Sequence, residues 1–445
     1  MTPRVLFACW PFDGHVFPQL SVAAELRERG VAVAFYSGES ARGSVESEGH
    51  ELFPLRRTAG AWQWVHERER AEGGRKPSMR LQRAAFREWL VESIPRQVAD
   101  LTEVRERFRP DVIVTETSMW GPALIMREAQ GIAVGLLSPQ IYAVIPGPDI
   151  PPLNSRVGVP RTCPARARAR VVSAIGALLA RPGRRRIDQL RANHGLPPLE
   201  RSVNEVLSGL PLYLVGSIPE LDLNRHDLPP GVRYVGALLW HPPDPPGTVA
   251  WLDTLPGDRP WVHVTEGTSH YQDPFLLRAA AAGLAGAPYE AILTTGRRRG
   301  GAISAQAPNV HVRDWLAHGA LLPRCSALVT TGGAGTTMAG LRAGLPLVLV
   351  PTSWDKPDIA LRMVEAGVAV RVAPRRCTPE ALRAAVDEVL GDPGYRENAG
   401  RIAEKLAAAP GPAGAADHIE ALANDARGAP AAAAPAVAAE GSLGA

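Results

Sequence analysis

The fold is decided by residues 327–372, which read ALVTTGGAGTTMAGLRAGLPLVLVPTSWDKPDIALRMVEAGVAVRV. An apolar β run opens the stretch, glycines crowd residues 332–335, and a helical pattern then extends to Gly344. Glycines in such a turn let the main chain approach a ligand closely, and the free N–H groups at a helix start favour an anionic oxygen. The stretch therefore predicts a strand, a glycine turn and a helix, and phosphate is the ligand that such a turn is most suited to bind.

A second unit of the same kind follows at once. It comprises a strand at 347–351, a turn at Thr352-Ser353-Trp354 and a helix from Asp355. The carboxyl ends of neighbouring parallel strands meet at one edge of a sheet, so the two turns should face the same crevice. A single glycine turn is more often explained by packing alone, whereas two paired turns favour a ligand.

Composition sets the class of protein. A chain of 445 residues predicts two domains of roughly 200 residues each. It is 45% hydrophobic and 21% charged, and no run approaches the roughly 18 apolar residues that a membrane span needs. The amino terminus is strand-like and too short for a secretory signal, so we expect a cytoplasmic protein. The four cysteines are widely spaced, which favours neither a zinc site nor a disulfide framework; they are Cys9, Cys163, Cys325 and Cys377.

The rest of the chain predicts two successive α/β series. The first has strands at 5–8, 31–36, 111–115, 133–137, 212–215 and 233–235, with a helix whose first turn holds Pro18 and a long helical region at 79–108 bent at Pro95. An arginine-rich helical pair is expected at 166–193; its arginines could attract acidic lipid or nucleic acid, and a solvated helix face is favoured over a nucleic-acid site. The predicted second series has strands at 261–265, 290–294 and 310–312 and helices at 274–284, 379–390 and 395–409.

These patterns predict the domain organisation. Residues 1–240 should form a first Rossmann-like domain, with a proline-rich linker from about 236, and residues 248–410 a second one. A C-terminal helix is expected at 411–427. Residues 428–445 are nearly all Ala, Pro and Gly and should be disordered.

The glycine turn, the proline-ended strand and the Trp-Asp-Lys-Pro-Asp turn at 354–358 together resemble the nucleotide-sugar signature of family 1 (UDP-glycosyltransferase-like) enzymes, particularly actinobacterial enzymes of natural-product type. The resemblance covers nearly the whole chain. It implies an α/β protein of GT-B architecture, in which two doubly wound Rossmann-like domains face each other across a cleft.

The resemblance assigns the donor site to the second domain. There Trp315 matches the tryptophan that stacks on the nucleotide base, although a Trp beside a strand is by itself more often part of a core. The expected donor-binding residues are Gly267, Thr268, Trp315, Thr331, Gly332, Gly333, Gly335, Thr336, Thr337, Trp354, Asp355 and Lys356.

Three positions depart from the family pattern. Thr331 stands where the family usually has His, Ala339 where it has Glu, and Lys356 where the sugar-reading pair has Gln. Lysine occurs only at 76, 356 and 405. We therefore expect the ammonium of Lys356 to supply charge to the diphosphate, the alternative being a surface lysine without a ligand.

The first domain holds the expected catalytic base. His15 lies on a glycine turn ahead of a helix, and a neutral imidazole can take a proton from a hydroxyl near pH 7, although a lone histidine at a turn is more often structural. The resemblance assigns His15 as the base. Its orienting carboxylate is expected to be Glu116, one methylene longer than the family's Asp, with Asp13 as the alternative.

Aromatic and soft residues of the first domain suggest an apolar acceptor pocket, although core packing explains any one of them equally well. They are Trp62, Trp64, Met79, Phe86, Trp89, Trp120 and Tyr142.

The sequence thus predicts an inverting, metal-independent glycosyltransferase that moves a sugar from a UDP or dTDP sugar to an OH or NH of an apolar natural product, as in antibiotic biosynthesis. No cofactor, nucleic acid or transmembrane segment is expected, and a homodimer is compatible with these features. Two alternatives stay open: a nucleotide-sugar epimerase of the same fold, and a non-catalytic partner protein that has lost donor binding.

Overall fold

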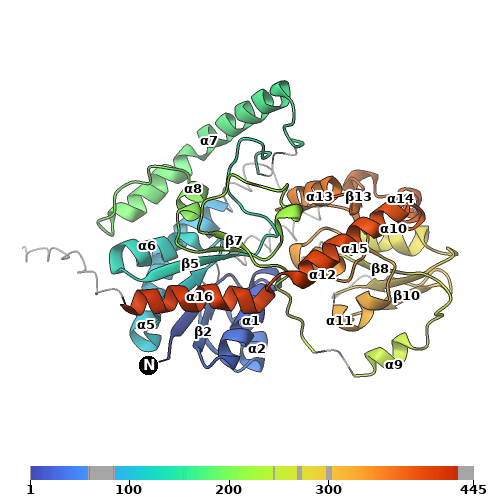
Figure 1. Cartoon of the computed structure of the whole chain (residues 1–445), viewed down its shortest axis with the longest axis horizontal. Helices are drawn as coiled ribbons and strands as arrows, with labels where there is room; N and C mark the ends of the chain where they lie inside the picture. Colours follow the sequence, from blue (N-terminus) through green and yellow to red (C-terminus); the bar gives the residue numbers. More distant parts are fainter. Residues whose placement is uncertain are drawn as a thin grey trace, which may run out of the picture.

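The computed structural model describes residues 2–58, 60, 84, 86–153, 155, 157–243, 246–267, 273–296 and 303–428. Two parallel sheets lie side by side, each flanked by helices (Figure 1). The chain completes the first sheet before it enters the second. Two doubly wound α/β units, as predicted from the sequence, are confirmed.

The first sheet has seven strands in the order β3-β2-β1-β4-β5-β6-β7, and all of its neighbouring strands are parallel. Consecutive strands run outward in one direction up to β3, and the chain then returns to the other side of β1 with β4. The strands are β1 (Arg4–Ala8), β2 (Ala32–Ser37), β3 (Glu51–Pro54), β4 (Val112–Thr115), β5 (Ala133–Ser138), β6 (Tyr213–Val215) and β7 (Val232–Tyr234). The reversal between β1 and β4 creates a crevice at the carboxyl edge, where ligands of such sheets bind.

The second sheet repeats this plan with six strands in the order β10-β9-β8-β11-β12-β13. They are β8 (Trp261–Thr265), β9 (Glu290–Thr294), β10 (Val310–Arg313), β11 (Ala327–Thr330), β12 (Leu347–Leu349) and β13 (Ala369–Arg371). Its reversal lies between β8 and β11, so the glycine turn after β11 opens into the second crevice.

Helices cover both sheets (Figure 1). Those before the linker are α1 (Asp13–Glu28), α2 (Arg42–Ser47), α5 (Ile94–Phe108), α6 (Trp120–Gln130), α7 (Cys163–Ala192) and α8 (Val203–Ser208). Those after it are α9 (Thr248–Leu252), α10 (Phe275–Gly283), α11 (His318–Leu321), α12 (Ala334–Arg342), α13 (Lys356–Glu365), α14 (Pro379–Gly391), α15 (Pro393–Ala408) and α16 (Gly411–Gly428). Short 3₁₀ turns occur at Glu39–Ala41, Pro219–Leu221, Leu322–Arg324 and Pro374–Arg376, and a π-helical turn at Glu88–Glu92.

The first helix begins earlier than the sequence predicts. Because Pro18 fits best in a first helical turn, the sequence suggested a helix start close to it. The structure instead starts α1 at Asp13, with Phe12 as its N-cap, and places Pro18 inside the helix. His15 therefore lies in the first helical turn instead of in a loop.

Two further expectations about helices were wrong. The helical pair predicted at 166–193 is a single helix, α7, which continues through Pro182. The bend predicted at Pro95 is a helix start, because Pro95 occupies the first turn of α5, where a missing N–H costs nothing. Strand β3, at one edge of the first sheet, was not predicted at all.

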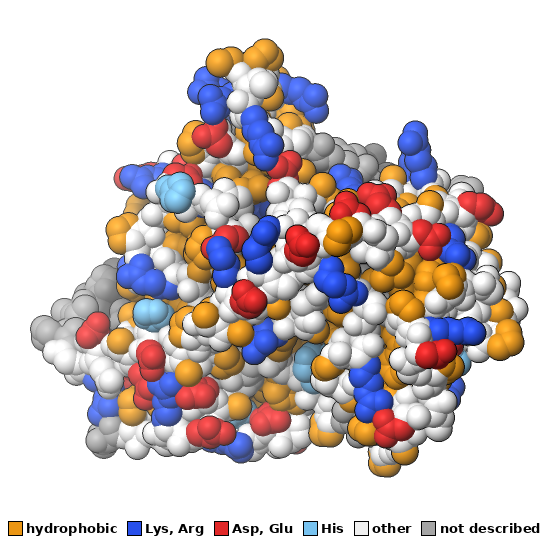
Figure 2. Space-filling view, turned by 45° about the vertical axis from the view of Figure 1, so that its right-hand side comes forward, with side chains coloured by type: hydrophobic (Ala, Val, Ile, Leu, Met, Phe, Trp, Pro, Cys, Tyr) orange, Lys and Arg blue, Asp and Glu red, His pale blue; other side chains and the backbone are white. Residues whose placement is uncertain are grey.

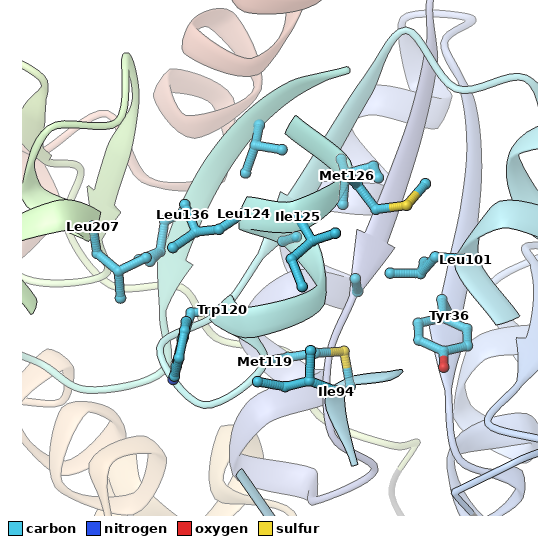
Figure 3. Packing of buried hydrophobic residues seen from close by; sticks show 14 of the residues in the cluster. Tyr36, Ile94, Leu101, Met119, Trp120, Leu124, Ile125, Met126, Leu136 and Leu207 are labelled. Carbon is cyan, nitrogen blue, oxygen red and sulfur yellow. The ribbon is translucent and has the colours of Figure 1, made fainter. Parts of the chain in front are cut away.

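Each sheet is buried on both faces, as parallel sheets are. On one face of the first sheet, Trp120 and Met119 of the β4–α6 segment pack with Ile94 of α5, as Figure 3 shows. The opposite face is covered by α1 and, at the end of the described chain, by α16, whose Ile419 is fully buried in the same cluster as Leu20. The C-terminal helix thus leaves the second sheet and returns to the first (Figure 1).

A buried ion pair joins the two halves. Arg362 of α13 donates from Nε to Asp222 Oδ1 at 2.9 Å, and the two side chains are only 1% and 0% exposed. The other carboxylate oxygen of Asp222 accepts the Tyr234 hydroxyl at 2.6 Å and the Ala143 N–H at 2.8 Å. The guanidinium also lies 3.9 Å from the ring centre of Tyr142. Asp222 therefore fixes α13 against three segments of the first half.

Among the described residues, no helix combines the length and the apolar character needed to cross a membrane.

Removing Arg362 should strongly destabilise the packing of the two halves against each other. Arg362→Met leaves the Asp222 carboxylate buried and uncompensated, which costs about 3–5 kcal/mol in the free energy of unfolding, measurable by urea denaturation. The matched control is Lys405→Met, because Lys405 pairs with Glu220 across the same boundary but is 54% exposed. This exposed pair should contribute about 1 kcal/mol or less. Equal losses in both variants would show that the buried pair has no special weight.

Candidate active site

A cavity of about 410 Å³ lies between the carboxyl edges of the two sheets. The first half contributes the start of α1 and the segments after β4 and β5, and the second half contributes the segments after β8, β11 and β12. Both topological crevices therefore open into one space. Its walls bring together His15, Trp89, Trp315, Gly333 and Asp355, which come from five separate parts of the chain.

His15 and Glu116 form the pair that the sequence suggested. Nδ1 of His15 lies 3.0 Å from Oε1 of Glu116, and the two side chains are 20% and 0% exposed. Adjacent strands β1 and β4 bring them together, because α1 follows the first and Glu116 directly follows the second. Since Nδ1 is engaged by the carboxylate, Nε2 is the ring nitrogen left for the cavity.

The longer side chain of Glu116 is held rigidly. Its Oε2 accepts the N–H of Ser118 at 2.6 Å, and its Oε1 also lies 3.4 Å from the N–H of Trp10. These donors satisfy a carboxylate that has no access to solvent. Glu116 thus fixes the ring orientation and tautomer of His15, which is the task of an orienting carboxylate. Asp13, the alternative, is exposed at the cavity rim.

Electrostatics favour the protonated form of His15. Burial disfavours the imidazolium, but the charge and hydrogen bond of Glu116, together with the charge of Asp355, outweigh it and raise the pKa of His15 above its ordinary value of 6.5. Proton binding by His15 therefore stabilises the fold. That contribution is complete below pH 6.5 and is lost as the pH rises through the folded-state pKa.

The glycine turn after β11 has the shape that an anion seat requires. Gly332 has a φ of 85°, a left-handed conformation that favours glycine, and Gly333 caps the first turn of α12. Of this segment, the cavity is lined by Gly333, Ala334, Gly335 and Thr336. The free N–H groups of the first turn of α12 thus lie at the cavity wall.

The turn after β12 adds two charged residues beside that seat. Asp355 and Lys356 both line the cavity, and Lys356 is only 5% exposed. The ammonium lies 3.3 Å from the hydroxyl of Thr352. A Cβ on Gly332 would lie 3.6 Å from the Lys356 carbonyl oxygen, so the two turns are adjacent. Burial raises the pKa of Asp355, while Lys356 and His15 oppose that shift.

Not every expected donor residue reaches the cavity. Thr331 is 1% exposed and donates its hydroxyl to the carbonyl of Glu266 at 2.9 Å. Thr337 and Gly332 are buried and do not line the cavity. Gly267, Trp315 and Trp354 do line the cavity, and Thr268 lies outside the described residues. Ala339, at the departure from the family pattern, is buried in the core of the second half.

An aromatic wall crosses the boundary between the two halves. Trp354, in a left-handed conformation with a φ of 61°, points its ring at the first half. Its ring centre lies 5.2 Å from Phe86 and 5.9 Å from Trp89, with edge-to-face geometry in both contacts. Trp354 was expected beside the donor, but it also completes the apolar wall formed by the first half.

The other expected acceptor residues divide into three groups. Tyr142 lines the cavity next to the buried ion pair. Trp120 does not line it; its ring packs in the first core, where it is 7% exposed (Figure 3). This expectation was wrong because an aromatic residue at the start of a helix can turn to either side. Trp62, Trp64 and Met79 lie outside the described residues.

Several cavity residues were not predicted from the sequence, and three of them have polar or aromatic side chains of interest. Glu266 follows β8 directly and lines the cavity with 2% exposure. Gln140 follows β5, and its side-chain oxygen accepts the hydroxyl of Thr117 at 2.8 Å. Both positions lie within two residues of a strand end at the carboxyl edge, which is a usable signal. Trp240, in the linker, gave no such signal; its ring packs 4.8 Å from that of Phe17.

No three His, Cys, Asp or Glu side chains converge as a metal site would require, as far as the structure describes the chain.

Comparison with known proteins gives matches over nearly the whole chain. A protein of Lentzea aerocolonigenes named 4'-demethylrebeccamycin synthase is 33% identical over 433 residues, covering 95% of this chain and all of that protein. Residues 281–422 match the family described as erythromycin biosynthesis protein CIII-like, C-terminal domain.

Two solved structures share the fold. The glycosyltransferase of kitacinnamycin superposes with a TM-score of 0.73 at 23% identity, over 95% of this chain and 99% of that one. A spinosyn rhamnosyltransferase complexed with thymidine diphosphate gives a TM-score of 0.66 at 18% identity, over 94% and 100%.

Glu116→Gln should lower the pKa of His15. The substitution removes the charge that raises this pKa and leaves the burial that lowers it, and an NMR titration of the His15 ring protons measures the shift. Glu290→Gln is the matched control, since it changes the His311–Glu290 pair of 2.8 Å, which does not line the cavity. The control should leave the titration of His15 unchanged. A wild-type titration curve for His15 in Glu116→Gln would refute the electrostatic role of Glu116.

Proposed function

The chain belongs to the GT-B glycosyltransferases of antibiotic and natural-product biosynthesis, and from this premise we propose that it is an inverting enzyme that uses a nucleoside-diphosphate sugar. The acceptor is an OH or NH of an apolar natural product. One observation carries the proposal: the His15–Glu116 pair faces the turn at Asp355 and Lys356 and the start of α12 across one cavity.

His15 is the general base of the proposed reaction. Its Nε2 takes the proton of the acceptor OH or NH, the freed electron pair forms a bond to the anomeric carbon, and the bond from that carbon to the diphosphate oxygen breaks. A single displacement of this kind inverts the anomeric configuration. Glu116 holds Nδ1–H and stabilises the imidazolium that forms. The raised pKa of His15 means that turnover requires a pH high enough to keep the ring neutral.

The leaving nucleoside diphosphate is stabilised by the second half. The start of α12 offers main-chain N–H groups and the positive end of the helix dipole, and Lys356 offers a nearly buried ammonium beside them. Because these groups can balance the leaving charge, the proposed reaction needs neither a metal ion nor another cofactor.

The base of the nucleotide stacks on Trp315 in this proposal, since that indole lines the second-half side of the cavity. The thymidine diphosphate complex of the spinosyn rhamnosyltransferase supports a donor of the UDP or dTDP class.

The aromatic wall favours a flat, apolar acceptor. Phe86, Trp89 and Trp354 contact one another and line the cavity that His15 also lines. Burying such surface provides the main driving force for an apolar ligand. This wall argues against an epimerase, which needs no second substrate of this kind. A non-catalytic partner is disfavoured by the His15–Glu116 pair and by relatives that are named as glycosyltransferases.

His15→Ala should lower kcat by about 10²- to 10⁴-fold and leave nucleotide binding nearly unchanged, as expected for a positioned base. Product formation with a panel of nucleotide sugars measures the first, and calorimetry with UDP and dTDP the second. His311→Ala is the control, because His311 has the same 20% exposure and also pairs with a buried Glu. Turnover of His15→Ala at the level of His311→Ala would exclude His15 as the base.

Lys356→Gln should weaken nucleoside-diphosphate affinity by about 10- to 150-fold, since a charged hydrogen bond in a nearly buried site is lost. Calorimetry measures the change, and Lys405→Gln, which removes an exposed ammonium outside this cavity, is the control. If Lys356→Gln binds the nucleotide as tightly as the control, Lys356 does not compensate for the missing histidine at Thr331.

A further inference from the structure

Helix α7 projects from the first half and is covered by little else (Figure 1). Along residues 170–182 every side chain is exposed except the half-buried Val172. A helix whose sides all face water gains little from tertiary packing and is expected to carry polar residues all round. The sequence of α7 does not follow that expectation.

Large aliphatic side chains form one exposed face of α7, which we call the aliphatic face. It consists of Val171, Ile175, Leu178 and Leu179, which are 59%, 53%, 54% and 47% exposed. Their spacing of four, three and one residues places them on one side of the helix. They are four of the seven large hydrophobic side chains that are exposed among the described residues. Exposed apolar side chains are therefore concentrated on this face instead of scattered over the surface.

Arginines surround the aliphatic face. The segment from Cys163 to Ile187 contains seven arginines and no Asp or Glu. The whole chain has 49 Lys and Arg against 45 Asp and Glu, which gives a net charge of +4. Without the seven arginines of this segment, the rest of the chain has a net charge of −3. The positive charge of the protein is therefore concentrated on α7.

Some of these arginines form ion pairs within the protein, and others do not. Arg166 pairs with Asp149, and Arg186 pairs with Glu92. Arg168, Arg170, Arg181 and Arg185 are exposed and make no ion pair with any described residue. We call these four the free arginines.

The free arginines border the aliphatic face and do not lie only on the opposite side of the helix. Arg168 precedes Val171 and Ile175 by three and seven residues, and Arg185 follows Leu178 by seven, so each extends the aliphatic face at one end. Figure 2 shows hydrophobic side chains at the crest of the projecting region with basic side chains on its flanks. Long arginine side chains can lie along an apolar surface and direct their charge toward its border.

From this arrangement we propose that α7 docks the protein on the surface of an anionic lipid bilayer. The aliphatic face enters the boundary between headgroups and acyl chains, and the free arginines contact the lipid phosphates. Nucleic acid fits less well, because it would leave the aliphatic face in water and the projecting stretch offers no aromatic side chain for stacking. The proposal goes beyond the proposed function and does not depend on it.

Vesicle co-sedimentation of the full chain tests the proposal without any activity assay. We expect binding to phosphatidylcholine vesicles that contain about one quarter phosphatidylglycerol, and at least about 10-fold weaker binding to phosphatidylcholine alone. High salt should weaken the binding, since it screens exposed charges. Absence of binding to anionic vesicles, or equal binding to both kinds, would overturn the proposal.

A charge variant and its matched control distinguish a specific contribution of α7 from the effect of positive charge elsewhere on the protein. Arg168→Gln, Arg170→Gln and Arg181→Gln combined should reduce the affinity for anionic vesicles by about 100-fold. Arg201→Gln, Arg342→Gln and Arg371→Gln combined remove the same charge from exposed positions outside α7 and should change it only slightly. Equal losses in the two triple variants would refute a specific role of α7.

A second variant tests the aliphatic face. Ile175→Gln, Leu178→Gln and Leu179→Gln combined should reduce vesicle binding at least 10-fold and leave the unfolding temperature unchanged, because these side chains are exposed. Val249→Gln, at a position 51% exposed outside α7, is the control and should bind like the wild type. If the triple variant binds vesicles normally but converts a dimeric wild type to a monomer in sedimentation velocity, the aliphatic face binds a second copy and the lipid proposal is wrong.

Discussion

The buried pair of Arg362 and Asp222 determines how the two halves of the active site face each other. Arg362 lies on α13, the helix that begins at Lys356 beside the proposed leaving group, and Asp222 belongs to the half that carries His15. A base can assist displacement only if it stands at a fixed distance from the bond that breaks. A charge pair removed from water is costly to form and costly to break, so it favours one relative position of the two sheets over neighbouring ones.

Within the first half, His15 and Glu116 are also held at a fixed distance from each other. His15 and Glu116 are 101 residues apart in the chain, yet β1 and β4 pair in register and bring them to 3.0 Å. The additional methylene of Glu116 is accommodated because Ser118 and Trp10 direct N–H groups at its carboxylate. Replacing the family's Asp by Glu thus changes the length of the orienting group without removing the orientation.

Much of the architecture could be predicted from the sequence because parallel strands and glycine turns have local signatures. The strands at Trp261–Thr265 and Glu290–Thr294 appear at the expected residues, as does the glycine turn between β11 and α12. The role of His15 came from family resemblance, since a histidine at a helix start has many uses. What could not be predicted depends on side-chain direction: Trp120 turns into the core, Trp354 reaches across the boundary, and Thr331 bonds to the Glu266 carbonyl.

The central claim is a single displacement in which His15 deprotonates the acceptor while the second half holds the leaving diphosphate. The anomeric configuration of the product tests it most directly, because one displacement inverts this centre and two restore it. The measurement is the one-bond carbon–proton coupling at the anomeric centre, compared by NMR between the nucleotide sugar and the glycosylated product. We expect inversion. Retention would contradict it, because a second displacement requires a covalent intermediate or another nucleophile, and His15 would then not act as proposed.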